Sequence, residues 1–115
     1  MIIGMERISI LKQEIIEIIK SIENEIQELT WKDPIFGFIT KKYTRCGKEN
    51  CKCAKGIKHQ HGPYYYLREE PEYKYVKYFG KKVPETIRSR IEIGVIIREL
   101  EKKHRKLLQS IKKLN

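Results

Sequence analysis

The sequence lacks any apolar run that approaches the roughly 18 consecutive residues needed to cross a membrane. The opening segment, residues 1–5, is too short for the core of a signal peptide, and the charged residues Glu6 and Arg7 follow it at once. We therefore expect a cytoplasmic protein with no membrane partner, associated with the nucleoid if it binds DNA.

Cysteine and aspartate are also scarce, and each scarcity argues against a class of protein. The three cysteines are an odd number, which argues against a closed disulfide framework. The one aspartate is Asp33, and the glutamates fall mainly on expected helix surfaces. Neither a paired-carboxylate nuclease site nor a Ser/His/Asp set is visible, so we expect no catalytic residues, no small-molecule substrate and no enzyme.

Positive charge, in contrast, is abundant and unevenly placed. The 115 residues include 25 Lys and Arg against 15 Asp and Glu, a formal net charge of +10. Residues 1–30 hold three basic and six acidic residues, a net charge of −3, whereas residues 41–58 hold seven and one, a net of +6. Residues 83–115 hold nine and four, a net of +5. Such a surface favours a polyanionic partner, with DNA or RNA ahead of anionic lipid.

The first segment, residues 1–33, has apolar residues at the 3-4 spacing of an amphipathic helix: Ile8, Leu11, Ile15, Ile18, Ile22 and Leu29. A second set widens this stripe, so that more than one partner surface can be buried: Ile16, Ile19 and Ile26. Trp31 is expected to pack where this helix meets the middle of the chain.

The last segment, residues 83–115, is expected to form a basic amphipathic helix. Pro84 suits its first position and Glu85 its first turn. Its apolar residues follow the heptad spacing, with His104 in the seam: Ile93, Ile97, Leu100, Leu107, Ile111 and Leu114. Two helices of similar length favour an antiparallel hairpin. Because one hairpin buries only part of these stripes, we expect a homodimer through the helices.

The middle segment, residues 34–82, is rich in Tyr, Phe, Gly, Lys and Cys. It contains three β-rich runs, at residues 36–43, 63–68 and 73–79, and the last two are expected to form a hairpin. Alternation in the third run places Tyr75 and Tyr78 on opposite faces. The expected fold class is therefore α+β, with two long helices flanking a small three-stranded β head that is stapled by zinc.

A cluster of possible metal ligands lies inside this head: Cys46, Cys51, Cys53, His59 and His61. Zinc takes four such ligands in a tetrahedron, and Cys₃His is a common structural set. The spacing is not that of a standard zinc finger, and the alternative is a loop of reduced cysteines with histidines that cap turns. We predict one structural Zn²⁺ with these ligands: Cys46, Cys51, Cys53 and His61. His61 is preferred to His59 because it adjoins Gly62, Pro63 and the following strand.

The same stretch resembles a family of small uncharacterised archaeal and bacterial proteins. The signature reads Cys-Gly-Lys-x-x-Cys-x-Cys-Ala-x-Gly followed by His-Gly-Pro-Tyr-Tyr-Tyr, and the residues that match it are Cys46, Gly47, Lys48, Cys51, Cys53, Ala54, Gly56, His61, Gly62, Pro63, Tyr64, Tyr65 and Tyr66. The resemblance covers residues 43–100, including the helix that begins near Pro84. It implies that His61, not His59, belongs to the motif, and it implies no biochemical role.

Basic residues interleave with tyrosines along the loop and the strands. Lys and Arg neutralise phosphates, while tyrosines stack on bases or bond phosphate oxygens. The candidate nucleic-acid-binding residues are Lys41, Lys42, Arg45, Lys48, Lys52, Lys55, Lys58, Tyr65, Arg68, Lys74 and Lys77. The alternative for each tyrosine is a place in the core of a small sheet.

These patterns support three hypotheses. The leading one is a zinc-stabilised protein that binds double-stranded DNA, as a regulator or as an architectural factor of chromatin. The second is an RNA-binding module, because a tyrosine-rich sheet with basic edges suits single-stranded RNA. The third is a coiled-coil adaptor for protein interactions, in which a structural zinc only staples the head.

Overall fold

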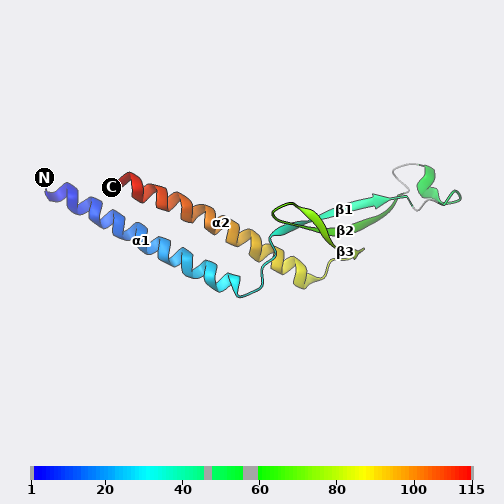
Figure 1. The fold of residues 1–115 in the computed structure, drawn as a ribbon, viewed down its shortest axis with the longest axis horizontal. Helices are drawn as coiled ribbons and strands as arrows, with labels where there is room; N and C mark the ends of the chain where they lie inside the picture. The colour runs from blue at the N-terminus through cyan, green and yellow to red at the C-terminus, as the bar shows by residue number, and fades with distance from the viewer. Residues whose placement is uncertain (1, 46–47, 56–59, 115) are drawn as a thin grey trace. The chain divides into compact units, whose positions relative to one another are not determined.

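The computed structural model describes residues 2–45, 48–55 and 60–114 of the chain (Figure 1). The elements run in the order α1 (Ile2–Thr30), β1 (Gly37–Thr44), a short 3₁₀ helix η1 (Lys52–Lys55), β2 (His61–Glu69), β3 (Lys74–Gly80) and α2 (Glu85–Leu114). Two helices and a three-stranded antiparallel sheet confirm the α+β class. The chain divides into two compact units, a helical unit of Met1–Pro34 with Ile93–Asn115 and a sheet unit of Ile35–Glu92.

The helical unit is an antiparallel pair made by α1 and the larger part of α2, with both chain ends at the same end of the pair (Figure 1). Its core contains Ile19 and Ile22 from α1 and Ile97 and Leu100 from α2, all buried. The expected seam of α2 is confirmed, since Ile97 is only 1% exposed and the other seam residues are buried or half-buried. Within the described residues, neither helix is apolar enough along its length to cross a lipid bilayer.

In α1 the buried residues differ from the main predicted stripe. Ile19, from the secondary set, is buried, whereas Leu11 and Ile18 are 48% and 49% exposed. Ile22 of the main stripe is buried beside Ile19, so the side of α1 that faces α2 lies between the two predicted stripes. Trp31, at the end of the helix, is 83% exposed, and its expected packed position is not observed.

In the sheet unit, β2 is the central strand and pairs antiparallel with both neighbours. The expected hairpin of the last two strands is present, and it closes through a turn in which the Tyr73 N–H donates to the Glu69 carbonyl at 2.8 Å. The β1–β2 register pairs Ile39 with Leu67 and Thr40 with Tyr66. The β2–β3 pairing is interrupted twice by β-bulges.

One face of this sheet is covered by the start of α2. Leu67 in β2 is 4% exposed. Ile35, just before β1, and Val83, just after β3, are also buried. The Ile35 N–H donates to the Arg90 carbonyl of α2 at 3.0 Å, and the Arg88 guanidinium lies 6.0 Å from the ring centroid of Tyr65. Tyr65 and Leu67 are two residues apart on one strand and share a face, so the contact of Arg88 with Tyr65 places the start of α2 on the face that carries Leu67.

Candidate nucleic-acid interface

The opposite face of the sheet carries a cluster of aromatic rings. Tyr66 in the central strand is the hub, with ring centroids 5.1 Å from Tyr75 and 5.1 Å from Tyr78. Tyr64 adds a ring 6.3 Å from Tyr78. Tilted and edge-on pairs at such distances are favourable aromatic geometries. We name this surface the tyrosine face and define it by Phe38, Lys42, Tyr64, Tyr66, Arg68, Tyr73, Tyr75 and Tyr78.

The rings of the tyrosine face remain open to solvent. Tyr78 is 56% exposed, Phe38 45% and Tyr75 43%, although the rings contact one another. Phe38 and Tyr73 extend the cluster, with centroids 5.3 Å apart. A contiguous exposed aromatic patch is a candidate interaction surface.

A β-bulge in β3 places Tyr75 and Tyr78 on this face together. Simple alternation predicted opposite faces for them, and that prediction is wrong because both rings contact Tyr66. In the register, Tyr66 pairs with Tyr78 and Arg68 pairs with Tyr75, so three steps on β3 match two on β2. The extra residue between them resets the alternation of side chains.

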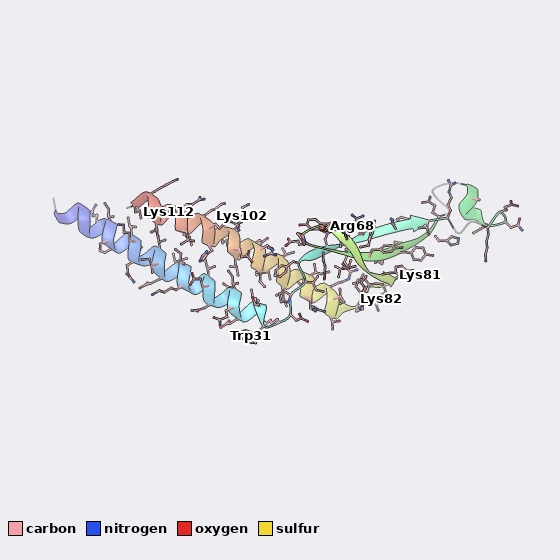
Figure 2. The ribbon with its side chains drawn as sticks, in the orientation of Figure 1. Trp31, Arg68, Lys81, Lys82, Lys102 and Lys112 are labelled. Carbon is pink, nitrogen blue, oxygen red and sulfur yellow. The ribbon has the colours of Figure 1, made fainter. Side chains whose placement is uncertain are left out.

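Two basic side chains, Lys42 and Arg68, lie against these rings. The Lys42 Nζ lies 4.8 Å from the Tyr75 ring centroid and 5.8 Å from that of Tyr66. The Arg68 guanidinium carbon lies 4.0 Å from the Tyr75 centroid, and its Nη2 donates a hydrogen bond to the Tyr75 hydroxyl. Figure 2 labels Arg68 on the sheet. Cations within about 6 Å of a ring face are attracted by its quadrupole.

These cations also change the acidity of the phenol. The hydrogen bond from Arg68 is the main cause of a lowered pKa at Tyr75, and Lys42 lowers that pKa further. The Nε of Arg68 is buried and has no hydrogen-bond partner within the described parts of the chain. Arg68 and Lys42 together thus favour the phenolate form of Tyr75.

The remaining predicted basic residues are distributed more widely. Lys41 pairs with Tyr65 and Lys77 with Leu67, which places both on the face that carries Tyr65. Lys74 forms an exposed ion pair with Glu72 at 2.7 Å. Three more side chains are exposed in or beside the loop that follows β1: Arg45, Lys48 and Lys52. The side chain of Lys55 and the whole of Lys58 lie outside the described residues.

Two of the four predicted metal ligands lie side by side. The Sγ of Cys51 is 3.1 Å from the Nε2 of His61. With Zn–S of about 2.3 Å and Zn–N of about 2.0 Å, two ligand atoms in a zinc tetrahedron stand about 3.6 Å apart. The pair thus offers two ligand types that zinc accepts, at a separation about 0.5 Å shorter than a zinc tetrahedron requires.

The positions of the other candidate ligand atoms are not described. Cys46, His59 and the side chain of Cys53 lie outside the described residues. Among the residues that are described, no group of three or more His, Cys, Asp or Glu side chains is close enough to hold a metal ion. The zinc site stays a prediction that rests on the Cys51–His61 pair.

Gly62 explains how His61 is held at the end of the sheet. Its φ of +131° is a conformation that side-chain-bearing residues rarely adopt, and a Cβ there would lie 2.7 Å from the Lys42 carbonyl. His61 itself pairs with Thr44 at the end of β1. The glycine of the motif thus brings β2 close against β1 beside both the ligand pair and Lys42.

A three-stranded sheet with one covered and one aromatic face, flanked by long helices, defines a small α+β protein with a candidate binding face. The chain belongs to the family described as a domain of unknown function (DUF6788), whose model matches residues 12–89. The match takes in most of α1, the whole sheet and the start of α2. No curated protein and no solved structure is significantly similar to the chain.

Proposed function

We propose that this protein binds nucleic acid on the tyrosine face, and that the strand it binds there is single. The observation that carries the proposal is the position of Lys42 and Arg68 among exposed, mutually packed aromatic rings. Such a surface offers the two things that a single strand needs, cations for the phosphates and ring faces for the bases.

Ring exposure favours single strands over a duplex. In a duplex the base faces are already stacked, so exposed tyrosines can reach only the edges of bases and the backbone. In a single strand each base has a free face, and stacking on an aromatic side chain contributes about 1–3 kcal/mol per base. The binding of duplex DNA, expected from charge, is a competing prediction that the same experiment tests.

The proposal includes a structural zinc ion beside this face. Its ligands would be Cys46, Cys51, Cys53 and His61, of which Cys51 and His61 adjoin at 3.1 Å. A bound zinc supplies folding free energy, because the thiolates and the neutral imidazole meet only in the folded chain. His61 begins the strand that continues into Tyr64 and Tyr66. The metal would therefore fix one end of the tyrosine face.

The direct test is competitive binding of fluorescently labelled oligonucleotides to the full chain. We expect a single-stranded RNA or DNA of mixed sequence to bind more tightly than a duplex of the same length, with affinity falling steeply as salt rises. Equal or tighter binding of the duplex would overturn the single-strand assignment. No binding of any nucleic acid at low salt would overturn the whole proposal and favour the protein-interaction adaptor.

A further inference from the structure

The helical unit has a second apolar stripe that α2 does not cover. Ile18 in α1 is 49% exposed and Ile96 in α2 is 38% exposed, although both lie next to buried residues of the same helices. Leu11 is 48% exposed along the same line of α1. This arrangement is independent of the tyrosine face, because all three residues belong to the helical unit.

These exposed residues lie on one side of the helical pair. Ile18 precedes the buried Ile19, and Ile96 precedes the buried Ile97, so each is turned by about 100° from the seam. In an antiparallel pair, equal rotations of this sense bring both residues to the same side. Leu11 lies at an equivalent rotation, seven residues before Ile18, so the exposed stripe consists of Leu11, Ile18 and Ile96.

The opposite side of the pair is polar. Lys20 follows Ile19 and Arg98 follows Ile97, which turns them by the same angle in the other sense. Arg98 forms an ion pair with Glu101 at 2.8 Å on that side. The two sides that flank the seam therefore differ in polarity.

We propose that a second copy of this chain covers the stripe, so that two helical pairs form a four-helix bundle. The spacing on α1 supports a helical occupant, since Leu11, Ile15, Ile18, Ile22 and Leu29 follow the 3-4 pattern of a coiled-coil seam. This pattern was the strongest periodicity of the sequence, yet the buried centre of the contact with α2 lies at Ile19. Ile22 of this pattern is buried with Ile19, so the part that is left for another helix is Leu11 and Ile18.

The two segments that contain the helices carry opposite net charges. Residues 1–30, which include α1, hold three basic and six acidic residues, a net charge of −3. Residues 83–115, which include α2, hold nine basic and four acidic residues, a net charge of +5. A two-fold axis can place the acidic helix of each copy beside the basic helix of the other, and closed two-fold pairing is the commonest form of self-association.

The test is sedimentation equilibrium of the full chain over a range of concentrations, with glutamate placed on and off the stripe. We expect a dimer for the unchanged chain, and a dissociation constant raised at least about tenfold by Ile18→Glu or Ile96→Glu, because each would bury an unpaired charge. The matched controls are Ile10→Glu and Val95→Glu, at residues that are 58% and 49% exposed but point away from both seam and stripe.

Helical circular dichroism is recorded for every variant, and the milder changes Ile18→Ala and Ile96→Ala replace any variant that fails to fold. A monomer at all concentrations would overturn the proposal and leave the stripe to another part of the chain or to an unrelated protein. Control variants that dissociate the dimer as strongly as the stripe variants would also overturn it, because the interface would then lie elsewhere.

Discussion

The guanidinium of Arg68 lies 4.0 Å from the ring centroid of Tyr75 and donates a hydrogen bond to the hydroxyl of the same ring. The pair joins adjacent strands, since Arg68 and Tyr75 are partners in the β2–β3 register. It therefore couples a cation to an aromatic ring at the centre of the tyrosine face. The effect of this contact on the pKa of Tyr75 can be measured by replacing Arg68 alone.

The first prediction concerns the titration of Tyr75. Replacing Arg68 by Gln should raise the pKa of the Tyr75 phenol, because the hydrogen bond from Arg68 is the largest cause of its lowering. Ultraviolet difference titration of the folded protein reports the change. Arg88→Gln is the control, since Arg88 lies over Tyr65 on the covered face.

The same shift links stability to pH. Because the folded-state pKa of Tyr75 is lowered, folding stabilises the phenolate, and this contribution is fully present above the pKa of an unfolded tyrosine. It is lost as the pH falls through the folded-state pKa. The stability of Arg68→Gln should therefore depend less on pH over this alkaline range than that of the unchanged chain. An identical dependence in both would contradict the assignment.

The second prediction separates stacking from charge on the tyrosine face. Tyr78→Leu should weaken the binding of single strands by about 1–3 kcal/mol with little change in its salt dependence. Lys42→Gln should instead reduce the slope of log affinity against log salt by about one phosphate contact. Tyr43→Leu is the control for the ring, because Tyr43 is 52% exposed on the same sheet but outside the tyrosine face.

Lys112→Gln is the matching control for the charge. Lys112 projects from the last turn of α2 (Figure 2). An equal loss from this variant and from Lys42→Gln would show that net charge alone, and not the tyrosine face, determines binding.

The third prediction concerns metal. Native mass spectrometry should find one zinc ion per chain, and Cys51→Ser or His61→Ala should abolish it. Removing the metal with a chelator should change the near-ultraviolet dichroism of the tyrosines and leave the helical signal largely intact. His59→Ala is the control, because only His61 is expected to be a ligand. Retention of one zinc by the His61 variant would assign the fourth ligand elsewhere.

The fourth prediction concerns the core of the helical unit. Ile97 is 1% exposed, so Ile97→Ala should reduce the free energy of unfolding by about 2–4 kcal/mol through the cavity that it leaves. Ile10→Ala, at a residue that is 58% exposed, should change this free energy by less than about 0.5 kcal/mol. Urea denaturation followed by helical dichroism measures both. An equal loss of unfolding free energy in both variants would contradict the burial of Ile97 between α1 and α2.

The fifth prediction concerns Gly62. Gly62→Ala should destabilise the sheet by roughly 1–3 kcal/mol, because it combines an unfavourable φ with a clash against the Lys42 carbonyl. Gly80→Ala is a matched control, since Gly80 also has a positive φ but has space for a Cβ, with the nearest atom at 3.8 Å. The difference in melting temperature between the two variants measures the effect of the close approach between Gly62 and the Lys42 carbonyl.

Local periodicity was sufficient to predict much of this fold. The seam of α2 around Ile97 and the three strands followed from apolar spacing and β propensity, which depend on near neighbours in the chain. The cysteine–histidine motif likewise predicted the neighbours Cys51 and His61, which lie 3.1 Å apart in space.

Two features could not be predicted, because they depend on pairing. Ile18 and Ile19 belong to stripes of similar apolarity, and only the packing of α2 decides between them. The common face of Tyr75 and Tyr78 requires a bulge, which depends on how β3 aligns with β2 and not on its own alternation. The interleaved tyrosines were predicted as a group, but the one named as a binding residue was Tyr65, which lies on the covered face beside Arg88. The density of tyrosine from residue 64 to residue 78 was the available signal.

The bulge also has an evolutionary consequence. Val76 is the residue of β3 without a partner between the Lys77–Leu67 and Tyr75–Arg68 pairs, and it is 54% exposed. Its removal would cost little buried area, and Tyr75 and Tyr78 would then be two residues apart, so that simple alternation would keep both beside Tyr66. Relatives that are one residue shorter in this strand should therefore retain the ring cluster without a bulge, whereas relatives with a regular strand of the present length should lose it.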